Sequence, residues 1–303
     1  MNGKAASDVR RPASDVGGLG SQSRSGSAGR SDPPAQTSER LRDVGRRTSD
    51  VGRWLLLGVV IMASAEERTL STEHLSIAVR PDLGGKVVSL RDAAGVEWLS
   101  RSGRPYAQRV PGMAYGEAEF DGIDEVFPNL ATGTMDLADG TQVALADHGE
   151  VWTQPWETID EGAGVIALVV TGRTLPYRLE RRIRLDGNTA VFAYTLHHTG
   201  GPAFPYTHCF HPLFALEDGL RVDPPDDQAC RYLYGKGVDL AKGDLPWSAA
   251  RSALGDLDPA SGRFWKVVAL GIQAPVVLVR ADGSRCVMTL SLIHISEPTR
   301  QAE

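Results

Sequence analysis

The fold is decided by one continuous stretch, Tyr177-Arg-Leu-Glu-Arg-Arg-Ile-Arg-Leu185, Asp186-Gly-Asn188 and Thr189-Ala-Val-Phe-Ala-Tyr-Thr-Leu-His-His198. Charged and apolar residues alternate along 177–185, and Arg181 is the exception on the apolar face. A period of two is typical of a half-buried β-strand. Asp-Gly is a common hairpin turn, so residues 189–198 are predicted to return antiparallel to the first strand.

Short alternating stretches continue on both sides of this hairpin. From about Ser71 to Thr289 they are separated by turn residues, and no segment shows a long helix with caps. The predicted strands are 75–80, 87–90, 164–170, 265–270, 275–280 and 285–289. The sequence therefore predicts an all-β fold, a large antiparallel β-sandwich in one domain over residues 70–289.

The composition fits a globular protein with a small-molecule partner. Of 303 residues, 42% are hydrophobic and 23% are charged, which excludes a wholly disordered chain and a multi-span membrane protein. The net charge of −6 disfavours nucleic acid, because phosphate binding needs a basic face. Cys209, Cys230 and Cys286 give no disulfide framework and favour a reducing compartment, so we expect a cytoplasmic protein without a membrane span.

The first 53 residues are unlike the middle of the chain. They are rich in Ser, Gly, Arg and Asp, and Lys4 with nine arginines outweighs six acids, a charge of about +4. We expect residues 1–61 to be a disordered or mistranslated extension. The apolar run 54–63 is too short for a membrane span, which needs about 20 residues. Followed by Ala63-Ser-Ala65, it also resembles a signal-peptide core, so export is the alternative.

The C-terminal stretch from residue 290 onward is predicted to come from a source other than the natural gene. Residues Leu290-Ser-Leu-Ile-His-Ile-Ser-Glu-Pro-Thr-Arg300 resemble the in-frame translation of a transposase adapter used in DNA sequencing libraries. We expect 290–303 to be an adapter-derived tail and the β-sandwich to be incomplete at its C-terminal end. A genuine short amphipathic tail is the alternative.

Three clusters carry the residue types that chemistry needs. The first is 120–128, with Asp121, Asp124 and Glu125; the second is 147–152, with Asp147, His148, Glu150 and Trp152; the third is 206–214, with His208, Cys209 and His211. Aromatic faces and carboxylates suit a sugar, because the C–H face of a sugar stacks and its hydroxyls need polar partners. No phosphate loop or dinucleotide motif is found. We expect no metal site, because the third cluster has no second ligand pair, and no cofactor.

These motifs resemble the aldose 1-epimerase (galactose mutarotase-like) family. The resemblance rests on Gly84-Gly85, His148-Gly149 and His211-Pro-Leu-Phe214. The motifs Asp124-Glu-Val-Phe-Pro128 and Asp147-His-Gly-Glu150 are similar to those of bacterial epimerase-like proteins. The resemblance implies a galactose mutarotase-like supersandwich and interconversion of the α and β anomers of an aldose by acid–base ring opening and closure.

The resemblance also implies roles for individual residues. His211 would be the general acid at the ring oxygen, and His148 would hydrogen-bond the sugar nearby. The expected substrate-binding residues are Asp124, Glu125, Asp147, Glu150 and Trp152. For Asp124 and Glu125 loop capping is an equal alternative, and for Trp152 a place in the core is equally expected.

Two features of the family have no match in this chain. The general base of active mutarotases is a late glutamate; Glu297 lies in the adapter-like stretch and is not assigned that role. The Asn-Arg substrate-binding motif is not found before His148, and Arg109, in the corresponding part, is not assigned either. The alternatives to an epimerase are therefore a noncatalytic carbohydrate-binding or sugar-sensing domain and, more weakly, a sugar-phosphate epimerase.

Overall fold

The computed structural model describes residues 67–291, apart from 163, 226–227 and 255–257. These residues all belong to one unit that spans 60–303. The predicted extension 1–61 and residues 292–303 of the predicted adapter tail lie outside the described residues.

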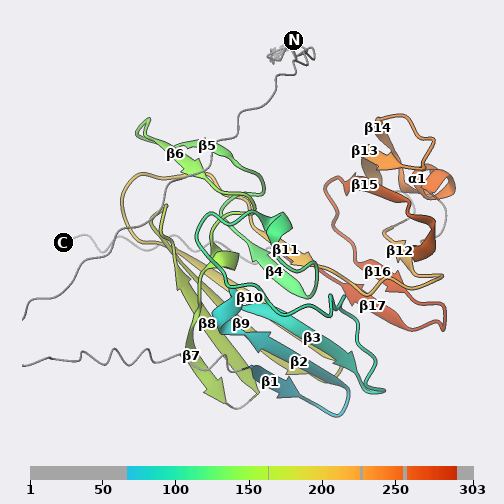
Figure 1. Cartoon of the computed structure of the whole chain (residues 1–303), viewed down its shortest axis with the longest axis horizontal. Coiled ribbons are helices and arrows are strands. Elements are labelled where there is room, and N and C mark those ends of the chain that lie inside the picture. Colours follow the sequence, from blue (N-terminus) through green and yellow to red (C-terminus); the bar gives the residue numbers. More distant parts are fainter. Residues whose placement is uncertain (1–66, 163, 226–227, 255–257, 292–303) are drawn as a thin grey trace, which may run out of the picture. The chain divides into compact units, whose positions relative to one another are not determined.

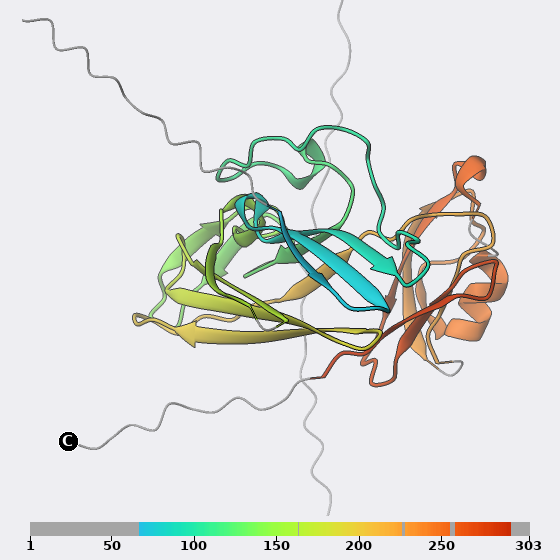
Figure 2. The same cartoon turned by 90° about the horizontal axis from the view of Figure 1, so that it is seen from below.

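Two antiparallel sheets form the main body (Figure 1). The first has the order β1-β2-β3-β4-β11, with β1 Arg68–Ser71, β2 Leu75–Arg80, β3 Lys86–Asp92, β4 Ile123–Val126 and β11 Cys209–Pro212. The second has the order β10-β9-β8-β7, with β10 Thr189–His198, β9 Tyr177–Asp186, β8 Val165–Thr171 and β7 Glu157–Gly162. Figure 2 shows the two sheets stacked face to face. The predicted β-sandwich is therefore confirmed.

Apolar side chains from both sheets meet in one core. Ile77 and Val79 of β2 and Ile166, Leu168 and Ile183 of β8 and β9 are all almost completely buried there. Alternate residues of a strand point to opposite faces, so the period of two places these side chains inside. Removal of this apolar surface from water is the main favourable contribution to the stability of the sandwich.

Smaller elements complete the described chain. Strands β5 Gly133–Asp136 and β6 Gln142–Leu145 form a two-stranded sheet of their own. Two further sheets have three strands each. One sheet has β12 Arg221–Asp223, β16 Val276–Val279 and β17 Arg285–Met288; the other has β14 Gly243–Pro246, β13 Ala229–Lys236 and β15 Phe264–Ala269. The helical elements are η1 Pro81–Leu83, η2 Tyr115–Glu117, η3 Val151–Thr153, α1 Trp247–Leu254 and η4 Pro259–Ser261. In this part of the chain no helix is long and apolar enough to cross a membrane.

The predicted hairpin forms in the expected register, and the structure explains its exception. Thr189 pairs with Asp186 and His198 pairs with Tyr177, so the whole of β10 returns along β9. Arg181 points into the core and is fully buried. Its Nη1 lies 3.0 Å from Oε1 of Glu125, and its guanidinium lies over the Trp156 ring. The charge on the apolar face is thus one half of an ion pair between the two sheets.

Candidate functional site

Strand β4 separates two polar clusters. Asp124 and Glu125 are adjacent, so their side chains point to opposite faces of the strand. Asp124 faces Tyr115 and His211, whereas Glu125 faces Arg181 inside the sandwich. The two carboxylates that the sequence places side by side therefore belong to different environments.

Asp124 is held by two donors on the same oxygen. Nζ of Lys86 lies 2.7 Å from Oδ2 of Asp124, and the hydroxyl of Tyr115 donates to that oxygen at 2.9 Å. Nζ of Lys86 also lies 3.5 Å from Oδ1 of Asp121. All three charged side chains are buried, and burial of a charge is tolerated only with such partners. Asp124 is thereby a fixed acceptor beneath Tyr115.

Tyr115 joins the two predicted histidines. His211 is the register partner of Asp124 across β11 and β4, and its Nδ1 lies 3.1 Å from the Tyr115 hydroxyl oxygen. The Tyr115 ring stacks on the His148 ring with centroids 4.2 Å apart and an interplanar angle of 12°. The two imidazole centroids are 5.5 Å apart. The tertiary structure thus brings His148 and His211 together, as the resemblance implies for one site.

The hydrogen bonds assign the proton positions on both rings. The Tyr115 hydroxyl donates its proton to Asp124, so its oxygen accepts Nδ1–H of His211. Nδ1–H of His148 donates to Oδ1 of Asp147 at 2.9 Å. Neither Nε2 atom has a hydrogen-bond partner among the described residues. Each histidine therefore presents an Nε2 that can take up or release a proton.

Burial sets the protonation of the central groups. It is the main cause that lowers the pKa of His211; His148 and Lys86 lower it further, and Asp124 opposes them. Burial, followed by the charge of Asp124, raises the pKa of Tyr115 far above its ordinary value. At neutral pH His211 is thus mainly neutral, and Tyr115 keeps its proton.

Glycines at positive φ hold the loops of the site together. Gly149 has φ +71°, and a Cβ there would lie 2.1 Å from the carbonyl oxygen of Phe127. A Cβ on Gly84, at φ +75°, would lie 2.2 Å from the carbonyl oxygen of Trp152. His148 itself has φ +58°, which is uncommon for a residue with a side chain. The Gly84-Gly85 and His148-Gly149 motifs are therefore positions of direct backbone contact.

Trp152 supports Tyr115 from within the protein. It is fully buried, and its ring meets the Tyr115 ring edge to face at 5.2 Å. The guanidinium of Arg109 lies 5.3 Å from the Trp152 ring centroid, and its Nη2 lies 3.0 Å from Oε2 of Glu119. Of the two expected places for Trp152, the core is the one it occupies.

Glu125 lies on the face of β4 that points away from His148 and His211. Its carboxylate accepts from Nη1 of Arg181, the Tyr194 hydroxyl and, at 2.8 Å, Nε2 of His208. Burial would raise the pKa of Glu125, but the hydrogen bond from His208 and the charge of Arg181 lower it overall. His208, which precedes β11, and His211 within it thus contact different groups, Glu125 and Tyr115 respectively.

Glu150 is also bonded to the protein. It accepts from the backbone nitrogens of Arg173 at 3.0 Å and Thr174 at 3.1 Å. The hydroxyls of Thr174 and Tyr177 donate to it at 2.8 Å each. The Glu150 carboxylate fixes the turn before β9. Of the predicted acids, Asp147 bonds His148 directly, and Asp124 is linked to His211 through the Tyr115 hydroxyl.

Sequence reasoning missed two contributors to the site, Lys86 and Tyr115, and left a third, Arg109, without a role. Tyr115 stands in a short Gly- and Ala-containing loop with no periodicity, so no local pattern singles it out. Phe120 belongs to the first predicted cluster and lies beside Tyr115, with ring centroids 5.8 Å apart. It is 52% exposed and so offers a free aromatic face at the edge of the site.

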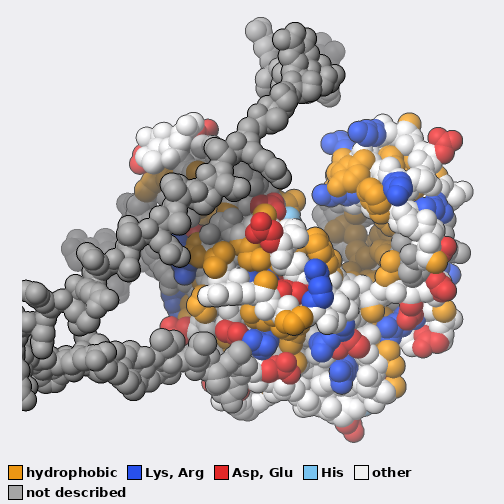
Figure 3. Space-filling view, in the orientation of Figure 1, with side chains coloured by type: hydrophobic (Ala, Val, Ile, Leu, Met, Phe, Trp, Pro, Cys, Tyr) orange, Lys and Arg blue, Asp and Glu red, His pale blue; other side chains and the backbone are white. Residues whose placement is uncertain are grey.

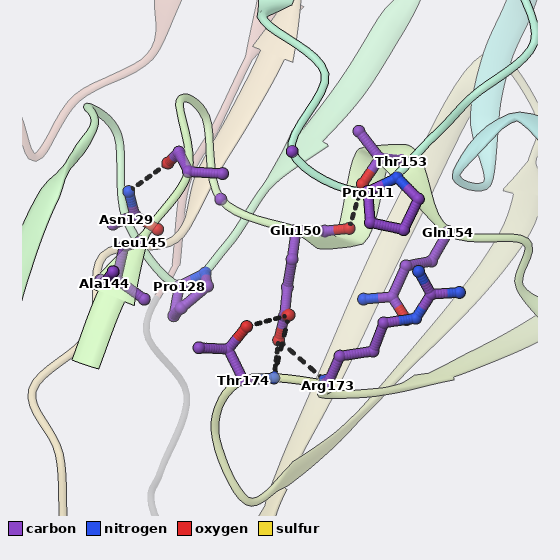
Figure 4. A pocket seen from close by; sticks show the side chains of 13 residues that line it. Pro111, Pro128, Asn129, Ala144, Leu145, Glu150, Thr153, Gln154, Arg173 and Thr174 are labelled. Atoms are coloured by element: carbon purple, nitrogen blue, oxygen red, sulfur yellow. Dashed lines mark hydrogen bonds between the residues drawn. The ribbon is translucent and has the colours of Figure 1, made fainter.

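A separate cavity of about 300 Å³ lies beside the loop that follows Gly149 (Figure 4). Asn129, Gln154 and Arg173 are among its lining residues, whereas His148 and His211 are not. No group of three or more His, Cys, Asp and Glu side chains with metal-binding geometry occurs among residues that the structure describes. Cys209, Cys230 and Cys286 are free thiols.

Comparison with solved structures identifies the architecture. The Slr1438 protein from Synechocystis sp. PCC 6803 superposes with a TM-score of 0.50 over 72% of this chain and 74% of its own, at 18% identity. A galactose mutarotase-like protein from Lactobacillus casei ATCC 334 also gives a TM-score of 0.50, over 72% of this chain and 77% of its own, at 15% identity. This chain has the galactose mutarotase-like fold. No protein-family model matches the sequence, and no curated protein does. At 15–18% identity, what this chain shares with these two proteins is the fold. The chemistry of this chain depends on the side chains of its own site.

Proposed function

We propose that the cluster around Tyr115 binds a monosaccharide and interconverts its anomers. The observation that carries this proposal is the pair of imidazoles, 5.5 Å apart, each anchored through Nδ1 and each with an Nε2 that has no partner among the described residues. The anomeric hydroxyl and the ring oxygen of an aldose are bonded to the same carbon. One sugar can therefore present both oxygens to this pair.

The reaction needs one proton acceptor and one proton donor. Nε2 of His148 takes the proton of the anomeric hydroxyl, and the electron pair of that O–H bond forms the C1 carbonyl. The bond between C1 and the ring oxygen breaks, and its electron pair stays on the ring oxygen, which takes a proton from Nε2 of imidazolium His211. After rotation about C1–C2 the steps reverse on the other carbonyl face. Each positioned proton transfer typically contributes about 10²–10⁴-fold.

The partners of the two histidines suit these roles. Asp147 orients His148 and stabilises the positive charge that develops when its Nε2 is protonated. Burial lowers the pKa of His211, so its imidazolium is the minor form at neutral pH but is a stronger acid toward the ring oxygen. Here His148 acts as the base, beyond the hydrogen-bonding role that the resemblance implied.

The surroundings suit an uncharged ligand. Lys86 is paired with Asp124 and Arg109 with Glu119, so charges of both signs are balanced around the site. Acidic, basic and hydrophobic side chains are also interspersed on the described surface that Figure 3 shows. The exposed ring of Phe120 is placed to stack on the C–H face of a sugar beside Tyr115. A small neutral sugar is the partner that these features favour.

Polarimetry tests the proposal directly. Freshly dissolved α-glucose or α-galactose should reach its equilibrium rotation faster with the protein than in buffer alone, and His211→Ala should remove nearly all of the acceleration. His197→Ala, at an exposed position on β10, is the matched control and should keep the wild-type rate. Sugar binding without acceleration would instead indicate the noncatalytic carbohydrate-binding domain.

A further inference from the structure

Lys86 is a fully buried lysine at the start of β3, and the reaction proposed above does not use it. Its ammonium lies 2.7 Å from Oδ2 of Asp124 and 3.5 Å from Oδ1 of Asp121. A buried ion pair is weak evidence for a stabilising role, because apolar residues of similar volume often stabilise a protein as well or better. This pair lies beside the hydroxyl that holds His211, so the lysine acts on the site.

A chain of three hydrogen bonds connects Lys86 to the imidazole. Nζ of Lys86 and the Tyr115 hydroxyl both donate to Oδ2 of Asp124, and the Tyr115 oxygen lies 3.1 Å from Nδ1 of His211. An ammonium can only donate, and the carboxylate paired with it can only accept. The Tyr115 hydroxyl therefore turns its proton toward Asp124, and its oxygen accepts from His211. The lysine at one end thus fixes the direction of every bond in the chain.

The direction of these bonds decides which nitrogen of neutral His211 carries the proton. Nδ1 donates to Tyr115, so Nε2 is the unprotonated nitrogen. The charged and titratable groups that act on the ring come from β3, β4, β15 and the loop before η3: Lys86, Asp124, Lys266 and His148. Among the described residues, the hydrogen-bond partner of Nδ1 is Tyr115. That bond, and with it Lys86, selects the tautomer.

We propose that Lys86 is a positioning residue that acts through Asp124 and Tyr115 and keeps neutral His211 in the Nδ1–H tautomer. Its effect on catalysis rests on the proposed function, in which imidazolium His211 gives the proton on Nε2 to the ring oxygen. That transfer leaves the remaining proton on Nδ1, which is the tautomer that the hydrogen bonds stabilise. When the sugar ring closes again, Nε2 takes a proton back. Lys86 thereby directs proton transfer to the nitrogen that is free to meet the sugar.

Long-range ¹H–¹⁵N NMR of the full chain, labelled with ¹⁵N-histidine, reads the tautomer at a pH of about 8, where His211 is neutral. In the wild type, the signals that His211→Gln removes should show a protonated Nδ1 and an unprotonated Nε2. Lys86→Met should shift these signals toward the Nε2–H tautomer. Without its cation, buried Asp124 takes up a proton from solvent and donates it to the Tyr115 oxygen. The Tyr115 hydroxyl then donates to Nδ1, and the imidazole proton moves to Nε2.

A pair of variants separates the effect of the lysine from that of the carboxylate charge. In Asp124→Asn the amide oxygen should take the place of Oδ2, because both donors are there and Oδ1 has no partner among the described residues, so the Nδ1–H tautomer should persist. In Lys86→Met/Asp124→Asn the amide can turn and donate to Tyr115, and the Nε2–H tautomer should appear. Lys236→Met, at an exposed lysine on β13, is the control and should keep the wild-type spectrum. Circular dichroism shows which variants are folded, and the double variant decides if Lys86→Met alone does not fold.

Two spectra would overturn the proposal: an Nε2–H tautomer of His211 in the wild type, or an Nδ1–H tautomer in folded Lys86→Met/Asp124→Asn. Polarimetry adds the catalytic readout, in which Lys86→Met should lower the turnover number by about 10- to 100-fold and change the Michaelis constant less. The expected spectra in a wild-type chain that does not accelerate mutarotation would support the role of Lys86 and contradict the proposed function alone.

Discussion

At the scale of single residues, the site depends on Tyr115. Its hydroxyl connects Asp124 to Nδ1 of His211, and its ring carries His148 on one face. One side chain therefore fixes the tautomer of one histidine and the position of the other. A positioned hydrogen bond of this kind matters more in a buried site than in water, because the local dielectric constant is low.

We expect Tyr115→Phe to lower the rate of anomer interconversion by about 10- to 100-fold, because His211 loses the partner of its Nδ1 while the ring stack on His148 remains. The Michaelis constant should change less than the turnover number, since Tyr115→Phe keeps the aromatic ring and removes only the hydroxyl. Polarimetric kinetics measure both values. Tyr206→Phe, at a half-exposed tyrosine beside Phe127, is the control and should behave as wild type. A wild-type turnover number in Tyr115→Phe would show that the hydroxyl plays no part.

At the scale of elements, the ion pair between β4 and β9 joins the two sheets. Arg181 and Glu125 are both fully buried, and Tyr194 and His208 complete the coordination of the carboxylate. In the alternation of charged and apolar residues along β9, Arg181 is an exception on the apolar face. The register of two distant strands turns that exception into a paired charge.

We expect Arg181→Met to lower the free energy of unfolding by about 3–5 kcal/mol, because it leaves the carboxylate of Glu125 buried without its strongest partner. Urea unfolding followed by circular dichroism measures this change. Arg184→Met lies three residues further along β9 with a half-exposed side chain, and it should change the free energy of unfolding by no more than about 0.5 kcal/mol. Equal losses in the two variants would contradict the assigned role of the buried pair.

At the scale of the whole molecule, buried titratable groups make stability depend on pH. The pKa of His211 is lowered in the folded state by burial and by His148, so the unfolded chain binds this proton more readily. The pKa of Glu125 is lowered as well, by His208 and Arg181 against the effect of burial. Both groups therefore contribute stability that is present above their unfolded pKa values, about 6.5 and 4.5, and is lost as pH falls.

We accordingly expect the melting temperature to decrease as pH is lowered from 7 to 5, before the carboxylates titrate. His211→Gln should reduce the slope in this range, because a side chain that does not titrate removes that proton uptake. Differential scanning calorimetry at several pH values measures it. His197→Gln, on the exposed part of β10, should keep the wild-type slope. A slope that is unchanged in His211→Gln would contradict the lowered pKa.

The sequence by itself determined several strands of this protein, among them the hairpin of β9 and β10. Alternation along 177–185 and the Asp186-Gly187 turn act over neighbouring residues, so the chain carries that information locally. It also pointed to His148, His211, Asp124 and Asp147, which do meet. Tertiary structure alone decided that Glu125 and Glu150 bond to the protein, that Trp152 is buried, and that Tyr115 joins the two histidines. These outcomes depend on strand register and on loops that meet across 23 to 96 residues of sequence, and no local periodicity encodes such contacts.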